Sequence, residues 1–541
     1  MGVFRRTTCT SIIAALVLIG GVVYAQLKMQ ASAYDDAYIH FRIAENLITY
    51  GVPYYNPTEA VMVSSSSGWT LILAGLGMVA RISPFLNLPT ITAVFNGIVT
   101  GTGALVYLRL LRRSHAYPRR IIVEIFFGVA YLSQMIKPSL GLMETPFAIL
   151  LAGFTLLALI SNKPYSFILL GMLPFFRPEL ALVTVLGLVY AHITQGTGIK
   201  GWAATILGAL PFIIVNLLFF GSLIPNTLRV KSTIYSIGLA GTLSEFISKI
   251  IDDIYWLRGV LSLSDFLLIL YAFLVLTIIT SCLTIFIYKQ VRKPGSASHQ
   301  IIRSPFMLFI LWSLGTLGVY IASHVKLFTW YEPLYLIPGL LALCIALHSF
   351  NPRVERWIAI ALLLSQAIGL IEIMLTVLVN PVVYQDFGET ARVRRYMTVG
   401  KALYTCFPNA RLMTSEIGGL GYTFRGQVLD GGGLASPQAL EFHPMSVPEE
   451  RSSGSIGAIP VGFIQAEQPE IMVSYDVFIE AFLRSPAVQQ YQRYQIPILN
   501  EEDYSASGIR DIWGSPALSV FIRNDFLASE RDGCPTLGIT P

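Results

Sequence analysis

Few of the 541 residues of this chain are charged. Asp, Glu, Lys and Arg make up 13% of it, whereas soluble domains carry about 25%. Apolar residues account for 54%, and the mean hydropathy is +0.63. This composition excludes an ordinary soluble protein and predicts a polytopic membrane protein. The apolar excess ends near Val379, and residues 381–541 have the composition of a soluble domain.

Signals for bound cofactors are also missing. The sequence has no His and Cys cluster with zinc spacing, and two carboxylates alone hold Mg²⁺ or Mn²⁺ only weakly. The glycines Gly431-Gly432-Gly433 predict a turn, but no G-x-G-x-x-G follows a strand, which argues against a nucleotide site. No cofactor is therefore expected, and no nucleic acid is expected as a partner.

Two apolar segments fix the predicted topology. Segment 11–27 follows basic residues and is signal-like; we interpret it as an uncleaved first span with a cytoplasmic N-terminus. Segment 68–82 is shorter than the roughly 20 residues that a span needs, and we interpret it as an interfacial helix on the outer face. Counting it as a span would place Arg112 and Arg113 outside, against the positive-inside rule.

About eleven membrane spans are predicted on this basis. Lys and Arg concentrate in the short loops that this topology places inside, and an odd number of spans places residues 381–541 outside. The predicted domains are a transmembrane domain, 1–380, with an external loop at 28–88, and an extracytoplasmic α/β domain, 381–541. The predicted spans are 11–27, 89–111, 121–137, 145–160, 165–176, 180–193, 202–220, 263–288, 305–323, 333–350 and 357–379.

A polar stretch follows the first span. It contains Asp35 and Asp36, followed by Tyr38, His40 and Arg42. Ionisable residues beside a bilayer are expensive and indicate function by default. The alternative is a solvated loop after a membrane anchor. The following residues favour a functional site, because Tyr38, Ile39 and Phe41 continue an amphipathic helix and residues 56–69 are typical of an ordered loop.

Other polar residues fall at predicted outer ends of spans. Span ends are polar in most membrane proteins, and Trp330 and Tyr331 are typical belt residues. That explanation fits Glu144, Arg177 and Glu179 less well, because they lie in or against apolar helices. We therefore predict one external site shared by these residues. The predicted substrate-binding residues are Tyr38, His40, Arg42, Asn56, Glu59, Trp69, Glu144, Arg177, Glu179, Asn226, Arg229, Lys231, His324, Lys326, Trp330 and Tyr331.

These residue types suit a phosphate-linked sugar. Arg177, Arg229, Lys231 and Lys326 supply cations for phosphate oxygens. A neighbouring carboxylate can take a proton from an attacking hydroxyl, and aromatic rings can stack on a sugar. A lipid-bound donor with a phosphate leaving group needs this combination.

The order of short motifs resembles that of GT-C fold glycosyltransferases. The similarity is nearest to the terminal arabinofuranosyltransferase of bacterial cell-wall arabinan, which uses a polyprenyl-phosphate arabinofuranose donor. His40, the serine run 64–67 and the shorter chain depart from that pattern. The motifs that carry the resemblance are residues 35–42, 56–59, 65–69, 143–146, 177–179, 225–227, 414–418 and 430–434, with Gly141 and Tyr422.

The resemblance implies a function and a location. It implies a glycosyltransferase of the bacterial inner membrane whose site and C-terminal domain face outward, with Asp35 as the catalytic carboxylate and Asp36 as its partner. The residues alone do not separate the two. The acceptor is a glycan, a lipid or a surface protein. A transporter or flippase of a lipid-linked or anionic substrate is the alternative, although no internal repeat supports it; a non-catalytic assembly protein is a third.

The sequence of residues 381–541 predicts a small α/β domain that contains one disulfide bond. Segments 411–414 and 471–474 have the apolar character of buried strands, and Gly418-Gly419 predicts a turn. Cys406 and Cys534 are the only cysteines of this domain, and its predicted compartment permits disulfides. We predict a bridge between them; two unrelated thiols are the alternative.

Overall fold

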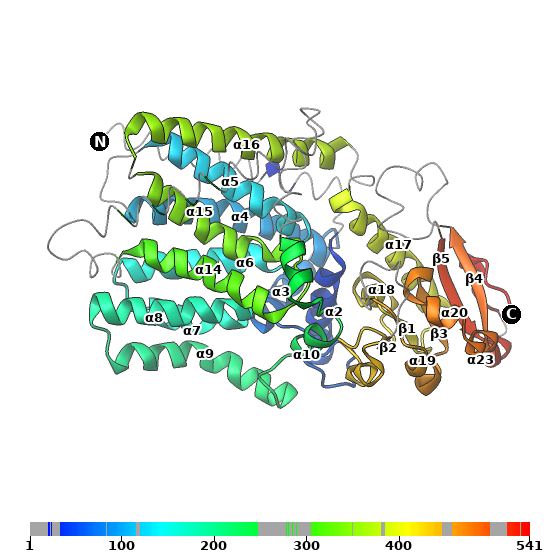
Figure 1. Ribbon diagram of the computed structural model, residues 1–541. Coiled ribbons are helices and arrows are strands. Elements are labelled where there is room, and N and C mark those ends of the chain that lie inside the picture. The colour runs from blue at the N-terminus through cyan, green and yellow to red at the C-terminus, as the bar shows by residue number, and fades with distance from the viewer. Residues whose placement is uncertain are drawn as a thin grey trace. The chain divides into compact units, whose positions relative to one another are not determined.

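A computed structural model provides the structure of the chain (Figure 1). It describes residues 33–246 except 83 and 115–119, residues 304–530 except 349, 380–384, 446–456 and 498–516, residues 532–541, and isolated positions in 20–23 and 277–288. The predicted spans 11–27 and 263–288 therefore lie outside the described residues, apart from those isolated positions.

The chain divides into two compact units. We call the first the helical unit; it consists of Met1–Ala25, Ala93–Ile213 and Gly238–Leu375. We call the second the mixed unit; it consists of Gln26–Thr92, Ile214–Ile237 and Thr376–Pro541. The first-loop residues therefore belong to the same unit as the C-terminal strands.

The helical unit is a bundle of apolar helices that run along roughly one direction (Figure 1). Within it, α14 packs against both α15 and α8. Its elements are α4 (Leu88–Arg113, which begins in the mixed unit), α5 (Ile121–Leu140), α6 (Thr145–Ile160), α7 (Ser166–Met172), η1 (Leu173–Phe175), η2 (Pro178–Leu180), α8 (Ala181–Gln195), α9 (Ile199–Phe220, which ends in the mixed unit), α14 (Pro305–Ser323), η3 (Thr329–Tyr331), α15 (Pro333–Leu347) and α16 (Pro352–Val379, which ends in the mixed unit).

Five helices of the described residues are long and apolar enough to cross a membrane: α4, α5, α9, α14 and α16. The chain is thus a multi-pass membrane protein. The helices predicted at 145–160 and 305–323 are confirmed with the same bounds. The number of eleven spans stays a prediction, because α6 and α15 are among the helices shorter than a typical span.

A backbone break lies between the spans predicted at 165–176 and 180–193. The helix α7 passes into the 3-10 turn η1, and Arg177 then has an extended backbone at φ −156° and ψ 126°. Pro178 follows directly, and a residue before proline is disfavoured in the helical region. The helix is therefore interrupted at Arg177, whose backbone is extended rather than helical.

The mixed unit holds a five-stranded sheet of order β2-β1-β3-β5-β4. The strands β2, β1 and β3 are parallel, and β5 pairs antiparallel with β3 and β4. Its elements are α2 (Asp35–Tyr50), α3 (Ser67–Ala80), α10 (Asn226–Thr233), α17 (Gln385–Cys406), β1 (Leu412–Thr414), α18 (Ile417–Phe424), β2 (Val428–Asp430), η4 (Pro437–Phe442), α19 (Val461–Glu467), β3 (Ile471–Ser474), η5 (Asp476–Phe478), α20 (Glu480–Leu483), η6 (Pro486–Gln490), β4 (Tyr491–Pro497), β5 (Ala517–Arg523), α23 (Asn524–Ser529) and η7 (Pro535–Leu537). The α/β character and the strands predicted at 411–414 and 471–474 are confirmed.

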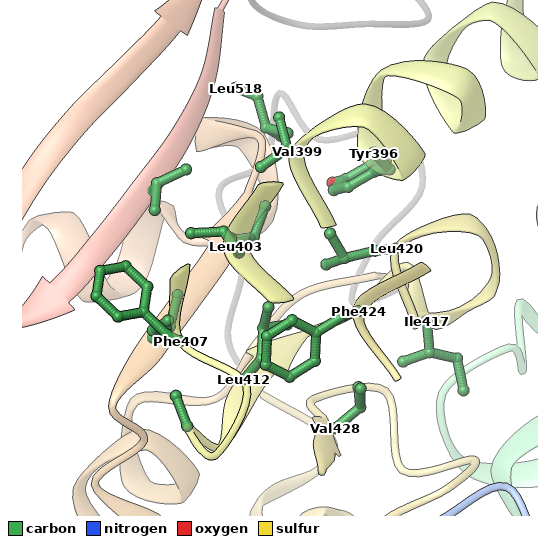
Figure 2. Close-up of a cluster of buried hydrophobic side chains, with 14 of the residues drawn as sticks. Tyr396, Val399, Leu403, Phe407, Leu412, Ile417, Leu420, Phe424, Val428 and Leu518 are labelled. Carbon is green, nitrogen blue, oxygen red and sulfur yellow. The ribbon is translucent and has the colours of Figure 1, made fainter. Parts of the chain in front are cut away.

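The core of the mixed unit forms where α17 packs on α18 and on the sheet. Tyr396, Val399 and Leu403 recur at helical spacing on one face of α17 and are buried. Figure 2 shows them among Leu420 and Phe424 of α18 and residues of the strands. This apolar face positions α18, whose first turn contributes to the site described below.

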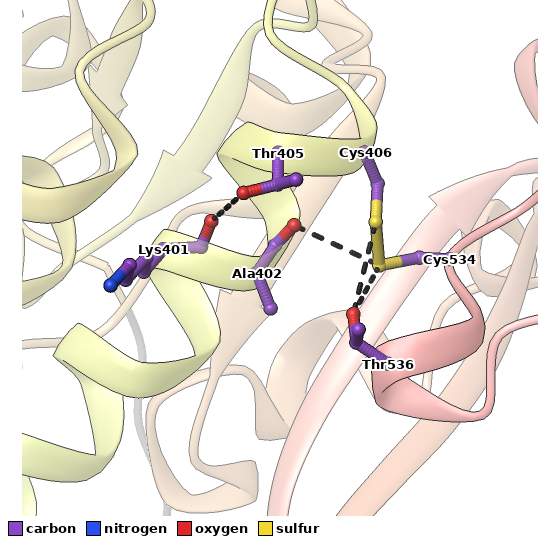
Figure 3. The surroundings of a disulfide bond; sticks show 6 residues. All are labelled: Lys401, Ala402, Thr405, Cys406, Cys534 and Thr536. Atoms are coloured by element: carbon purple, nitrogen blue, oxygen red, sulfur yellow. Dashed lines mark hydrogen bonds between the residues drawn. A yellow bond between two sulfur atoms is a disulfide. The ribbon is translucent and has the colours of Figure 1, made fainter.

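The predicted disulfide is confirmed. Cys406 ends α17 and Cys534 precedes η7, with the two Cα atoms 5.5 Å apart (Figure 3). That distance lies within the range of about 4.4–6.8 Å that a bridge requires. The bond joins residues separated by 128 positions and ties the C-terminus to α17.

Candidate functional site

The Asp35-Asp36 pair lies in the first turn of α2. Tyr34, the residue before the helix, is extended, and both carboxylates are half-buried. Negative charge is favourable at a helix N-terminus, where the backbone N–H groups point outward. Helix electrostatics alone therefore favours two carboxylates at this position, whether or not they take part in catalysis.

Asp35 joins this turn to α18. Its Oδ2 accepts the backbone N–H of Gly418, and its Oδ1 accepts that of Gly419, both at 2.8 Å. The two N–H groups belong to the first turn of α18, where they have no partner inside the helix. Asp35 therefore caps a helix that is 383 positions away in the sequence.

Gly418 allows this close approach. A Cβ at this position would lie 1.9 Å from the backbone oxygen of Asp35 and 2.6 Å from its Cγ. The turn predicted for Gly418-Gly419 is wrong, because both residues are helical in α18. The glycine at position 418 is needed because Asp35 approaches its backbone closely. This contact joins residues far apart in the chain, so the local sequence pattern cannot predict it.

Arg42, predicted as a substrate contact, is buried beneath this junction with an exposure of 4%. Its guanidinium donates to the backbone oxygens of Tyr55 and Gly426 at 2.8 and 2.6 Å, and also to that of Gly421. It lies over the ring of Tyr55, 4.4 Å from the centroid. Burial lowers the pKa of Arg42. These contacts hold α2, the first loop and α18 together.

Asn56 and Glu59 connect the first loop to β2. The Asn56 side chain donates to the Val428 backbone oxygen at 2.9 Å and accepts the Val428 N–H at 3.2 Å. Glu59 accepts from Asn56 at 3.0 Å and from Gln427 at 2.8 Å. Both predicted site residues thus extend the edge of the sheet toward the first loop.

The aromatic and imidazole side chains of this region are packed in the interior. Tyr38 is 2% exposed and its ring lies 5.3 Å from that of Tyr422; burial raises its pKa above the usual value. His40 Nδ1 lies 3.1 Å from Ser64 Oγ, and Trp69 is fully buried. These side chains therefore belong to the interior of the mixed unit.

The short helix α10 carries three further predicted residues. Asn226 is buried and donates to the backbone oxygens of Gly433 and Leu434 at 2.7 and 2.8 Å. Lys231 is half-buried, whereas Arg229 is exposed and lines a cavity of about 570 Å³. Asn226 thus anchors α10 to the loop after β2.

In the helical unit, the structure brings Glu144, Arg177 and Glu179 together. Arg177 pairs with Glu144, and its Nη2 and Nε donate to Glu179 at 2.8 and 3.1 Å. Tyr320 donates to Glu179 at 2.9 Å, and the guanidinium lies 4.8 Å from the ring centroid of Tyr331. Two carboxylates therefore engage the cation that was predicted to bind phosphate. Tyr320 was not predicted, because one more aromatic residue inside an apolar helix carries no distinguishing signal.

The remaining predicted residues follow α14. His324 is exposed and left-handed at φ 53°, and Lys326 is half-buried. Trp330 is buried, stacks on Phe328 with 4.7 Å between centroids, and accepts a hydrogen bond at its backbone oxygen from Thr145 at 2.8 Å. The predicted site residues thus form two groups, one in each unit.

Within the described ranges, no group of three or more His, Cys, Asp or Glu side chains converges in a way that could hold a metal ion.

Comparison with known proteins identifies the fold. No protein-family model matches the chain, and no curated protein matches it in sequence. Among solved structures, it is similar to ArnT from Cupriavidus metallidurans bound to undecaprenyl phosphate, with a TM-score of 0.53, 13% identity, and coverage of 96% of this chain and 98% of that one. It is also similar to the arabinofuranosyltransferase AftD from Mycobacteria, with a TM-score of 0.47, 14% identity, and coverage of 94% of this chain and 40% of that one.

The likeness to ArnT extends over nearly the whole of both chains. The protein is therefore a multi-pass membrane protein with the GT-C fold, as the order of its motifs predicted. At this identity the likeness defines the fold alone.

Proposed function

We propose that this protein is a membrane glycosyltransferase that moves a sugar from a polyprenyl-phosphate donor to an acceptor hydroxyl. The observation that carries the proposal is the GT-C fold over the full length of the chain, shared with a structure that holds undecaprenyl phosphate. The two aspartates at the start of α2 supply the carboxylate that such a transfer needs.

Asp36 is the general base in this proposal. Its carboxylate takes the proton of the acceptor hydroxyl as that oxygen bonds to the anomeric carbon of the sugar. The bond from the anomeric carbon to the phosphate oxygen breaks, and its electron pair leaves with the polyprenyl phosphate. No further reactant is needed for the atoms and charges to balance.

Asp35 is the positioning residue beside it. Both of its carboxylate oxygens accept N–H groups of α18, so a movement of Asp35 toward an acceptor would leave two helix N–H groups without their acceptor. Asp36 is the next residue of the same turn and is half-buried. The hydrogen bonds of Asp35 thus favour Asp36 as the base.

A cation for the donor phosphate completes the proposal. Lys231, in the mixed unit like Asp36, is half-buried, and a lysine ammonium binds phosphate as a compact charge. Arg177 acts differently: its ion pairs with Glu144 and Glu179 fix the backbone break before α8. Lys231, rather than Arg177, is therefore assigned to the phosphate.

The cellular setting follows the sequence prediction. We assign the protein to the bacterial inner membrane, with the site and residues 381–541 on the extracytoplasmic side. Arabinofuranose is the favoured sugar by the resemblance of the motifs, and the acceptor is a glycan, a lipid or a surface protein.

Reconstitution tests the proposal. The purified protein, in vesicles with polyprenyl-phosphate arabinofuranose labelled in the sugar, is given a cell-envelope glycan fraction. We expect release of polyprenyl phosphate together with label in the acceptor. If the labelled lipid crosses the bilayer intact and no label leaves the lipid, the protein is a flippase and the proposal is wrong.

A further inference from the structure

A cavity of about 570 Å³ opens in the mixed unit between α10 and η4. Its volume is within the range of about 300–1,000 Å³ that small-molecule sites have. The proposed transfer step makes no use of it. The side chains that matter for its chemistry are Arg229, Ser232, Pro437, Gln438, Leu440 and Glu441.

Buried hydrogen bonds fix both walls of the cavity. Asn226, at the start of α10, donates to the backbone oxygens of Gly433 and Leu434 at 2.7 and 2.8 Å. In the same loop, buried Asp430 accepts the N–H groups of Gly432 and Ala435, each at 2.8 Å. The loop leads directly into η4, so the two walls are connected without a ligand. Such preorganisation reduces the entropy lost on binding.

The charges of the cavity are balanced. Arg229 on α10 and Glu441 on η4 are both exposed, and neither has an ion-pair partner among the described residues. One cation and one anion leave no net charge that would select a phosphate or a metal ion. They provide instead an array of N–H donors and a pair of carboxylate oxygen acceptors.

The remaining lining residues suit a polyhydroxylated ligand. Gln438 adds an amide that both donates and accepts, and Ser232 adds a hydroxyl. Pro437 and Leu440 offer an apolar surface to the C–H face of a ring. Donors, acceptors and a small apolar wall together match a neutral sugar, whose hydroxyls both donate and accept.

We propose that the cavity between α10 and η4 binds a neutral carbohydrate and, resting on the proposed function, that this carbohydrate is part of the acceptor. The acceptor class is then a glycan or a glycosylated molecule. Arg229 and Glu441 each bind hydroxyls of the sugar, and Pro437 and Leu440 contact its ring.

The test measures binding without any donor. The full-length protein in lipid nanodiscs is examined by saturation-transfer NMR with arabinofuranosyl, glucosyl and N-acetylglucosaminyl disaccharides, and with inorganic phosphate as a competitor. The variants are Arg229→Gln and Glu441→Gln. Glu480→Gln, in α20, is the control for the loss of a carboxylate charge, because Glu480 pairs with Arg484 and does not line the cavity.

We expect at least one disaccharide to bind the wild type. Each cavity variant should raise the Kd of that disaccharide about tenfold, which corresponds to a loss of about 1.4 kcal/mol of hydrogen bonding. Glu480→Gln should bind as the wild type does, and phosphate should not displace the sugar. Three results would overturn the proposal: no binding of any disaccharide, wild-type binding by both folded cavity variants, or displacement by phosphate. This binding test uses no donor, so its outcome does not depend on transfer activity. If the protein binds the sugar but transfers none, the proposed function is wrong and the carbohydrate site stands.

Discussion

Asp35 Oδ2 lies 2.8 Å from the backbone nitrogen of Gly418, so the first turn of α2 and the first turn of α18 share one hydrogen-bonded junction. The neighbouring Gly419 donates to the other carboxylate oxygen at the same distance. A helix N-terminus that follows a parallel strand is a common site for an external anion. Here the anion is a side chain of the protein itself, and it belongs to the pair that we assign to catalysis.

Gly418→Ala should break this junction. The new Cβ would lie 1.9 Å from the Asp35 backbone oxygen, and backbone atoms on both sides leave little freedom to relax. We expect a lower melting temperature and a large loss of sugar transfer. Gly75→Ala in α3 is the control, because nothing lies within 4 Å of its added Cβ, and alanine favours a helix by about 0.5–1 kcal/mol. Equal melting temperatures for Gly418→Ala and the wild type would contradict the junction.

Arg42→Lys should destabilise the mixed unit even though it keeps the charge. A lysine cannot reproduce the fork that reaches Tyr55, Gly421 and Gly426. Each lost hydrogen bond to a charged group costs about 1.5–3 kcal/mol, so we expect a loss of at least about 2 kcal/mol in chemical denaturation. Arg425→Lys, an exposed partner of Glu45, should change stability by less than about 1 kcal/mol. A loss no larger for Arg42→Lys than for Arg425→Lys would argue against a structural role for Arg42.

The disulfide should contribute measurably to stability. Cys406 and Cys534 are 128 positions apart, and closing a loop of ~100 residues gives about 4–5 kcal/mol in the chain-entropy model. We expect the melting temperature of the wild type to fall when a reductant is added. The Cys406→Ser/Cys534→Ser double variant should melt at the lower temperature with or without reductant. Two free thiols in the denatured wild-type protein, found by alkylation and mass measurement, would show that no bridge forms.

Asp430 should make the stability of the mixed unit depend on pH. Burial raises the pKa of this carboxyl to about 6, while N–H groups of the following loop oppose the shift and Asp35 adds to it. The folded state therefore holds the proton more tightly than the unfolded state. This stabilising contribution is complete below about pH 4, the ordinary pKa of Asp, and is lost as the pH rises through about 6.

Asp430→Asn should remove that dependence. Denaturation midpoints are compared at pH 5 and pH 7.5 for the variant and the wild type. We expect the wild type to lose more stability than the variant between the two pH values, because only the wild type must ionise a buried carboxyl. The same pH dependence in both proteins would exclude Asp430 as its source.

Most of the fold could be predicted from the sequence, because its signals are local. The apolar helices α6 and α14 have the predicted bounds, and the short apolar runs of β1 and β3 indicated strands. The pairing of Cys406 with Cys534 followed from there being two cysteines in the tail. The interruption at Arg177 was also indicated, because the predicted spans 165–176 and 180–193 stop on either side of it. The ion pair of Arg177 with Glu144 could not be predicted, since the two residues are 33 positions apart and meet only in the packed structure.

The candidate site was less accessible from the sequence. The residue types of Asp35 and Arg42 indicated that this region is functional. They did not indicate that Asp35 accepts the N–H groups of α18 or that Arg42 donates to its backbone. The roles of Gly418 and Gly419 depend on a contact 383 and 384 positions away in the chain. A pair of glycines after a strand predicts a turn from local conformational freedom, and only the packed structure shows that they serve close approach instead.

The most direct test of the central claim compares Asp36→Asn with Asp35→Asn in the reconstituted transfer assay. Loss of a general base lowers the rate about 10²–10⁴-fold, so Asp36→Asn should remove transfer while the protein remains folded and inserted in the membrane. Asp35→Asn keeps one carbonyl oxygen for α18, and it should lower the melting temperature and reduce transfer less. Wild-type transfer by a folded Asp36→Asn protein would contradict the account.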